Sequence, residues 1–177
     1  DLSDIAIIPF QMNWSTGRWS FKLWESIVAP TGGYDASGSD LANLGRNYWS
    51  FDTIGAVTWF NPDSGTEMSI APGVMFNTEN SDTDYETGTE FHLDFVANQF
   101  LSETFALGLR GYYYSQFTGD SGAGATLGDF ESESFALGPG FVWTGGRFTV
   151  LGKWLHDFSA DNRFESDYIT LTVAWTF

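Results

Sequence analysis

Hydrophobic and polar residues alternate along this chain, most regularly in its last ten residues, 168–177. Odd positions there are apolar from Ile169 to Phe177, whereas even positions are Tyr, Thr or Ala. Successive side chains of a β-strand point to opposite faces, so this segment predicts a strand with one apolar and one polar face. At about 3.3 Å per residue, a tilted strand of this length crosses a bilayer. A soluble β-sandwich can also end on such a strand, so the rest of the chain must decide between the two.

Eight further segments alternate in the same manner, and the first of them, which contains Pro9, does so least regularly. They are residues 4–14, 18–29, 47–60, 66–76, 89–98, 104–116, 131–143 and 147–158. Short turn-forming stretches lie near residues 15–17, 61–65, 101–103 and 144–146. They alternate along the chain with longer polar stretches at residues 30–45, 77–87, 118–130 and 159–167. Soluble meanders have no reason to do this, but outer-membrane barrels have short periplasmic turns and longer outer loops. The pattern favours an all-β, transmembrane, antiparallel up-and-down β-barrel with about nine strands visible here.

The composition agrees with a membrane barrel. Aromatic residues make up 18% of the chain, with eight Trp, and there are twenty Gly, yet the mean hydropathy is slightly negative at −0.15. Only alternate residues of a barrel strand meet lipid, and aromatic belts mark both interfaces. Trp49 and Phe51 lie near the long-loop end of the third segment, and Trp59 lies near its short-turn end. An aromatic-rich secreted lectin would have a similar composition, so composition alone only narrows the choice.

Charge and composition exclude several classes of protein. The chain has no cysteine, so it contains neither a disulfide framework nor a thiolate metal site. Its net charge of −16 argues against nucleic-acid binding, which needs a basic surface. No stretch approaches the run of roughly eighteen apolar residues that marks a transmembrane helix. We expect no cofactor, and the chain starts at Asp1 as a processed or truncated product would.

The strand count makes a prediction about the N-terminus. The last strand must descend towards the periplasm, so with nine strands the first descends as well. Bacterial single-chain barrels have even strand numbers. We therefore expect residues 1–177 to form one barrel domain from which an odd number of N-terminal strands is missing, unless two strands are merged within residues 1–14.

Short strings that run through nearly the whole chain resemble one family, the outer-membrane channels named after the meta-cleavage pathway of phenol degradation. The strings are Ala29-Pro30-Thr31-Gly32, Leu44-Gly45-Arg46-Asn47-Tyr48-Trp49, Asn77-Thr78-Glu79-Asn80, Asp82-Thr83-Asp84-Tyr85, Glu90-Phe91-His92-Leu93-Asp94, Gly111-Tyr112-Tyr113-Tyr114, Ala136-Leu137-Gly138-Pro139 and Lys153-Trp154-Leu155. They occur in order, which makes the resemblance specific.

The resemblance implies a monomeric twelve-stranded barrel in the outer membrane of Gram-negative bacteria, of which this chain lacks about the first three strands. It implies a channel for passive uptake of small molecules, aromatic or otherwise hydrophobic compounds among them, and no enzyme. The expected surroundings are lipid and lipopolysaccharide, with Phe177 as a terminal signal for the barrel assembly machinery. Glu25 departs from the pattern because its position should be apolar. Either a bulge shifts the register there, or an acid faces lipid near an interface.

Charged residues that alternation places on the polar face are candidates for lining the pore. They are Arg18, Lys22, Asp52, Glu67, Glu90, His92, Asp94, Arg110, Arg147, Lys153 and Asp157. Rings of charge in a narrow pore set the preference for ions and solutes. The same charges can instead pair across the lumen and plug it, as interior side chains do in small barrels. Five of the seven Lys and Arg residues belong to this set, which hints at a pore that attracts anions.

Two alternatives to a channel stay open. Glu90, His92 and Asp94 share one face at i, i+2 and i+4, and as a catalytic or metal site they would make the protein an outer-membrane hydrolase. Catalysis needs a nucleophile or second base held in a geometry that a sequence does not show, so a polar lumen network is the simpler interpretation. The other alternative is a structural barrel with a plugged lumen.

Pro72 and Pro139, like Pro9, lie inside predicted strands. Each removes one ladder hydrogen bond, and proline is normally confined to edges or bulges. We favour the interpretation that these residues bend the barrel wall. The alternative is a gap between strands at Pro72 and Pro139 that gives apolar solutes a lateral exit into the membrane.

Overall fold

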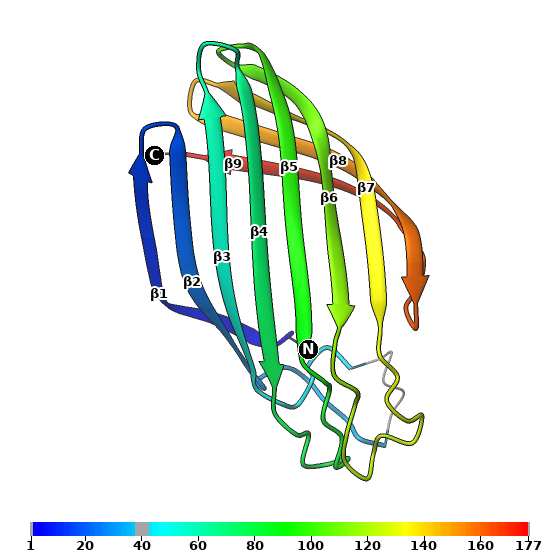
Figure 1. Cartoon of the computed structure of the whole chain (residues 1–177). Helices are drawn as coiled ribbons and strands as arrows, with labels where there is room; N and C mark the ends of the chain where they lie inside the picture. The colour runs from blue at the N-terminus through cyan, green and yellow to red at the C-terminus, as the bar shows by residue number, and fades with distance from the viewer. Residues whose placement is uncertain (1, 38–42, 177) are drawn as a thin grey trace.

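The computed structural model describes residues 2–37 and 43–176, which form one antiparallel sheet with its strands in chain order (Figure 1). The strands are β1 (Ile5–Thr16), β2 (Trp19–Ala29), β3 (Ser50–Asn61), β4 (Thr66–Asn77), β5 (Glu90–Ser102), β6 (Phe105–Gln116), β7 (Glu133–Gly145), β8 (Phe148–Asp161) and β9 (Asp167–Trp175). Each strand pairs with the next along the chain, and β1 and β9 form the two edges. The predicted all-β up-and-down architecture with nine strands is confirmed. Within the described ranges, no helix is long and apolar enough to cross a membrane.

The connections at the two ends of the sheet differ in length. The turns at residues 17–18, 62–65, 103–104 and 146–147 lie at one end, here called the turn end. Residues 30–37, 43–49, 78–89 and 117–132 gather at the opposite end, here called the loop end (Figure 1).

The last connection at the loop end is shorter than predicted. The sequence pattern predicts a loop over residues 159–167, but only residues 162–166 link β8 to β9. Ala160 and Asp161 still pair with Ser134 and Glu133 of β7, because backbone pairing does not require apolar side chains. The predicted loop bounds are therefore wrong here, but the short-then-long alternation holds, because residues 146–147 precede the longer connection 162–166.

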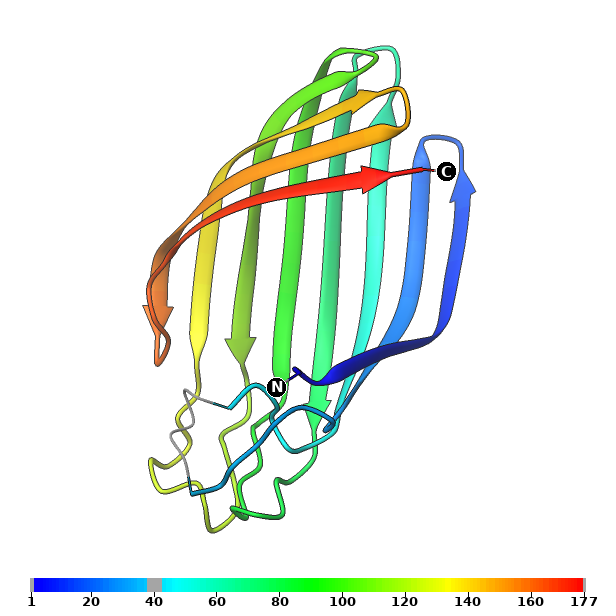
Figure 2. The ribbon, with the colours of Figure 1, turned by 180° about the vertical axis from the view of Figure 1, so that it is seen from behind.

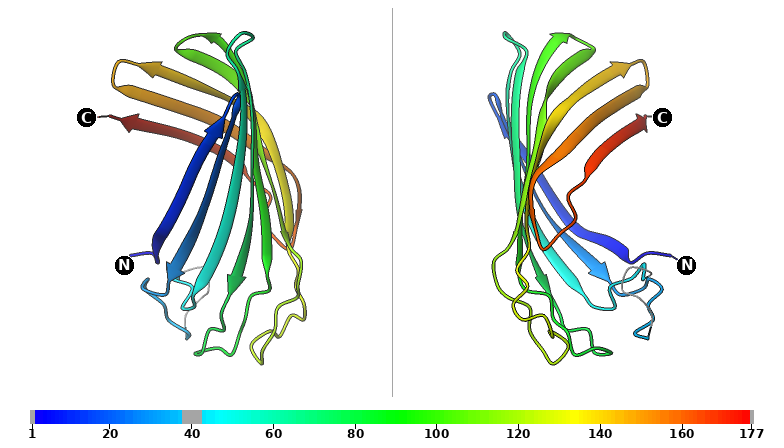
Figure 3. Two further views of the ribbon diagram at one scale, coloured as in Figure 1. Left: turned by 60° about the vertical axis from the view of Figure 1, so that its left-hand side comes forward. Right: turned by 90° about the vertical axis from the view of Figure 1, so that its right-hand side faces the viewer.

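The sheet is strongly curved. Strands β7–β9 lie behind β1–β5 in Figure 1 and in front of them in Figure 2, and the side views of Figure 3 show the same curl. The side chains of one face bridge across intervening strands: the Tyr112 hydroxyl on β6 donates to Asp157 Oδ1 on β8 at 2.6 Å, passing over β7. The inside of a curved sheet brings the polar side chains of non-adjacent strands towards one another. The face with Tyr112 and Asp157 is therefore the concave face.

Burial on this sheet is the reverse of that in a soluble protein. Among the described residues, ten buried side chains are polar or charged and only four are hydrophobic. The convex face carries the large apolar side chains, of which Leu107 is 48% and Leu171 is 66% exposed. Soluble proteins bury such residues and expose polar ones. Phe91, Leu107, Leu137 and Leu171 therefore do not share a closed core, in agreement with a membrane barrel.

Aromatic side chains form a row on the convex face near the turn end. Its tryptophans are Trp14, Trp19, Trp59, Trp143 and Trp175. Trp14 stacks on Phe21 with ring centroids 5.4 Å apart, and Trp175 stacks on Phe148 at 5.8 Å. Aromatic residues collect at the boundary between lipid and water, so this row places one interface at the turn end.

Strand β1 is bent where Pro9 lies. The register with β2 shifts between Ile7 and Phe10, so that two residues of β1 face one residue of β2. Proline lacks the N–H needed for the ladder and is tolerated at such bulges. On passing the bulge, the odd-numbered and even-numbered residues of β1 exchange faces. This exchange explains why the first segment of the sequence alternates weakly.

Glu25 points to the convex face. The register between β2 and β3 is unbroken, with Glu25 opposite Thr53, and the bulge lies in β1. The Thr53 hydroxyl donates a hydrogen bond to Glu25 Oε2 at 2.6 Å. Of the two expectations for this residue, the outward-facing acid is the one the structure shows, and the acid has a partner on the neighbouring strand.

Glycines on several strands make room for large side chains of their neighbours. On the convex face the Phe95 ring of β5 lies over Gly111 of β6, and the Phe141 ring of β7 lies over Gly152 of β8. A Cβ atom at Gly111 would be 2.4 Å from the Ala136 carbonyl oxygen and from the Phe95 ring. Close packing on this wall therefore depends on residues without side chains.

Replacing Gly111 by alanine tests this packing. The added methyl group forces the backbone or the Phe95 ring to shift, and we expect the free energy of unfolding to fall by about 1–3 kcal/mol, the usual cost of overpacking. Urea denaturation of the protein folded in detergent micelles measures the change. Gly55→Ala is the matched control, because its Cβ would meet no heavy atom within 4 Å and should change stability by at most about 0.5 kcal/mol. Equal losses in both variants would contradict the assigned packing.

Candidate functional site: the concave face

A histidine and an aspartate are joined across a strand in the loop-end half of the concave face. His92 Nε2 on β5 lies 2.9 Å from Asp52 Oδ1 on β3, above Gly73 of the intervening β4. A Cβ atom at Gly73 would be only 2.3 Å from His92 Nε2, so the glycine allows the ring to lie flat against the wall. Asp52 is 7% exposed, and the histidine is its hydrogen-bond partner.

Two tyrosines of β6 extend this polar surface. The Tyr114 hydroxyl donates to Glu90 Oε1 at 2.8 Å, and the Tyr112 hydroxyl donates to Asp157 Oδ1 at 2.6 Å. The prediction named only charged residues and missed both tyrosines. Both tyrosines are an even number of residues from Arg110 on the same strand and therefore share its face. This spacing is the signal that could have identified them.

A second polar chain lies closer to the turn end. Arg110 Nη2 on β6 donates to Asn98 Oδ1 on β5 at 3.3 Å, and Asn98 Nδ2 lies 3.5 Å from Glu67 Oε2 on β4. The Arg110 side chain runs over Gly140 of β7, where a Cβ atom would be 2.3 Å from Nε. Arg110 Nε is buried and has no hydrogen-bond partner among the described groups. This guanidinium group is therefore only partly satisfied by the protein.

Three further charged residues of the predicted set lie at concave-face positions: Lys22, Asp94 and Lys153. None of them has an ion-pair partner in the described part of the chain. Lys22 lies over the Trp24 ring, with Nζ 4.4 Å from the ring centroid. In the described part of the chain, no carboxylate lies within salt-bridge distance of Lys22, Lys153 or Arg110, and Asp94 has no cationic partner at that distance. These charges are therefore not neutralised by an ion pair within the described part of the chain.

Arg18 and Arg147 do not lie on strands. Arg18 occupies the turn between β1 and β2, where its guanidinium group contacts Asp63 Oδ2 at 2.6 Å in an exposed ion pair. Arg147 occupies the turn between β7 and β8, and its carbonyl oxygen accepts a hydrogen bond from the Thr176 amide. Alternation assigns a face only within a strand, so the place of these two residues on the lumen face stays a prediction.

The structure does not gather Glu90, His92 and Asp94 into one cluster. They follow one another along β5, and the hydrogen bond of His92 goes to Asp52 on another strand. Within residues 2–37 and 43–176, no group of three or more His, Cys, Asp or Glu residues could hold a metal ion. The arrangement is that of a polar network along the wall.

Pro72 and Pro139 both lie on the convex face, and each interrupts one ladder. Pairing of β3 with β4 is broken between Ile54–Gly73 and Val57–Ile70, opposite Pro72. Pairing of β7 with β8 is broken in the same way beside Pro139. Each gap follows from the missing proline N–H, and the strands resume the same register on both sides of the proline. A lateral exit at these two gaps stays a prediction.

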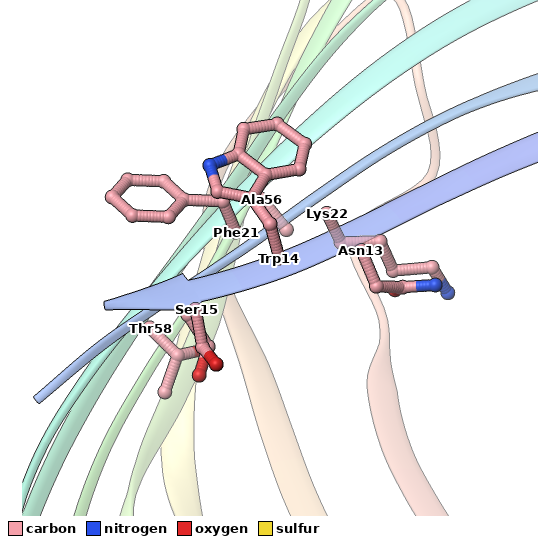
Figure 4. Close-up of a pocket in the computed structure, with 8 residues that line it drawn as sticks. Asn13, Trp14, Ser15, Phe21, Lys22, Ala56 and Thr58 are labelled. Carbon is pink, nitrogen blue, oxygen red and sulfur yellow. The ribbon is translucent and has the colours of Figure 1, made fainter. Parts of the chain in front are cut away.

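A shallow hollow of about 400 Å³ lies where β1, β2 and β3 approach the turn end. Figure 4 shows that its lining residues come from both faces, with Trp14 and Phe21 on one side of the ribbon and Ser15 and Thr58 on the other. It follows the edge of the sheet and is not an enclosed site. The concave polar wall is therefore the better candidate for function.

Comparison with known proteins agrees with this geometry. Residues 1–173 match the model of a protein family described as "Putative MetA-pathway of phenol degradation". The chain belongs to this family. The family match covers β1 to β8 in full and β9 up to residue 173.

A solved structure shares the fold of this family member. An outer membrane channel from Pseudomonas putida F1 superposes with a TM-score of 0.80 at 13% sequence identity. The match covers 97% of this chain and 64% of that channel, so this chain spans somewhat less than two thirds of the length of its structural neighbour. No curated protein matches the sequence. The sheet is thus a β-barrel wall of the outer-membrane channel type.

Replacing His92 by alanine tests the bridge over β4. The buried Asp52 carboxylate then lacks its hydrogen-bond partner, which should lower the free energy of unfolding by about 1–3 kcal/mol. Urea denaturation in micelles measures this, alongside Asp52→Ala and the double variant. We expect the double variant to cost less than the sum of the single changes, because both remove the same interaction. Strictly additive losses would show that the two side chains do not stabilise each other.

Proposed function

We propose that this chain forms much of the wall of an outer-membrane channel through which small molecules pass by passive diffusion. The observation that carries the proposal is the reversed burial, with polar side chains on the concave face and apolar ones on the convex face. An apolar convex face suits lipid, and a polar interior suits a water-filled lumen. This one arrangement supports both the proposed outer-membrane location and the proposed transport role.

An open lumen is favoured by the way large polar side chains lie against the wall. The His92 ring lies over Gly73, and the Arg110 side chain lies over Gly140. Side chains held flat leave the centre of a barrel free, whereas a plugged barrel fills it with interdigitating side chains. Neither arrangement supplies a nucleophile held by a base, so no specific observation favours the hydrolase alternative.

Two features support a preference among solutes. Lys22 and Lys153 lie on opposite parts of the sheet, on β2 and β8, without ion-pair partners in the described part of the chain. Unpaired cations inside a pore attract anions. Aromatic rings also face the lumen, including Trp24 and the edge-to-face pair of Phe60 and Phe100 at 5.6 Å. Together with the family's description, these rings support aromatic and hydrophobic molecules as solutes.

Conductance in a planar lipid bilayer is the direct test. We expect the purified protein to produce discrete current steps, because the polar face gives ions a hydrated path. A protein that inserts but never conducts would favour a structural barrel with a plugged lumen. Heat-induced mobility shifts on a gel would confirm that the inserted material is folded.

Neutralising lumen cations should change ion preference. We expect the double variant with Arg110→Gln and Lys153→Gln to lose anion preference, seen as a shift of the reversal potential in a KCl gradient towards the value for cations. Arg18→Gln is the matched control, because Arg18 lies in a turn against Asp63. An unchanged reversal potential in the double variant would count against a role for these cations.

A further inference from the structure

The three long connections at the loop end enclose a second hollow, of about 640 Å³. We call it the loop pocket. Its lining includes Tyr34, Arg46, Tyr48, Tyr85, Asp120 and Phe130, which come from residues 30–37, 43–49, 78–89 and 117–132. Small-molecule sites typically measure about 300–1,000 Å³. The loop pocket therefore has the size of a ligand site at the end of the barrel where the concave face opens.

Hydrogen bonds fix the walls of the loop pocket. Asp120 accepts from the Tyr85 hydroxyl, from Gln116 Nε2 at 2.6 Å and from the Gly88 amide at 3.2 Å. Burial of the phenol, together with its hydrogen bond to Asp120, raises the pKa of Tyr85 well above its ordinary value, so the phenol keeps the proton that it donates. The Asn47 side chain holds another wall of the pocket in place by donating a hydrogen bond to Asn80 Oδ1 at 3.0 Å. The pocket is thus held in shape without a ligand.

The lining indicates the chemistry of the occupant. Four aromatic side chains offer ring faces and edges, and Arg46 lies 6.0 Å from the Tyr48 ring centroid, beside the same space. Among the described lining residues Asp120 is the one acid, and it already accepts three hydrogen bonds, so it has little capacity left for a cation. The protein carries a net charge of −16, which disfavours the approach of anions. Aromatic walls with a guanidinium group favour a planar ring system.

We propose that the loop pocket binds uncharged aromatic molecules of one or two rings at the entrance of the channel. The inference rests on the proposed channel function and adds to it a recognition step outside the membrane. Binding there raises the local concentration of the solute at the mouth of the lumen. The hydroxyl groups of the lining tyrosines give a polar substituent of the ring a hydrogen-bonding partner.

Calorimetric titration with 2-naphthol at neutral pH tests the proposal on the protein in detergent micelles. We expect 2-naphthol to bind more tightly than decahydro-2-naphthol, which has no aromatic face, and than 2-naphthoate, which is charged. Replacing Tyr34 and Phe130 together by leucine should weaken 2-naphthol binding about tenfold, because two ring contacts are lost. Phe164→Leu is the matched control: Phe164 is 82% exposed and lies in the β8–β9 connection, outside the pocket.

Three outcomes would overturn the loop pocket as an aromatic site: equal binding of the saturated alcohol, tighter binding of the naphthoate, or unchanged affinity in the Tyr34/Phe130 double variant. Ala125→Trp provides a second variant, since Ala125 lines the pocket and a bulky ring there should abolish binding by occupying the space. Ion conductance of each variant separates the two proposals. Normal conductance with unchanged naphthol affinity refutes the loop pocket alone, whereas naphthol binding without any conductance refutes the channel and leaves the pocket.

Discussion

Lipid offers no hydrogen-bond partner to a backbone, so a chain that crosses it as strands must pair every N–H and C=O with its neighbours. The ladder that runs from β1 to β9 meets this requirement between neighbouring strands, whereas the outer edges of β1 and β9 have no partner strand among the described residues. Its breaks coincide with Pro9, Pro72 and Pro139, apart from bulges near the strand ends. Once the backbone is fixed in this way, each strand side chain can point only to one face of the sheet or to the other. The separation of apolar and polar groups between the two faces follows directly, and with it the aromatic row at one interface.

This constraint explains why so much of the fold could be predicted from the sequence. Lipid on one side and water on the other impose a period of two, and residues 168–177 display that period without interruption. The prediction of where strands end failed where the alternation of apolar and polar residues carries no information. Ala160 and Asp161 extend β8 because pairing with β7 does not depend on hydrophobicity. Arg18 and Arg147 lie in turns, where alternation does not assign a face.

The contacts of the concave face were much less accessible to prediction. His92 is two residues from Glu90 and from Asp94, yet it bonds to Asp52, forty residues away in the sequence. That contact depends on the register of three strands and on a glycine in the middle one, and no local pattern encodes both. The loop pocket depends on contacts such as Tyr85 with Asp120, thirty-five residues apart. The alternation of residues along a strand identifies the face on which a side chain lies. Its hydrogen-bond partners on that face depend on the register of all the strands.

The glycines beneath His92 and Arg110 have a consequence for the cross-section of the barrel. At Gly73 and Gly140 the wall is thin, and the neighbouring side chain fills the recess instead of standing upright. A methyl group at either position would tilt the imidazole or guanidinium group towards the barrel axis. Substitution at these two positions would therefore narrow the passage while leaving its charges unchanged.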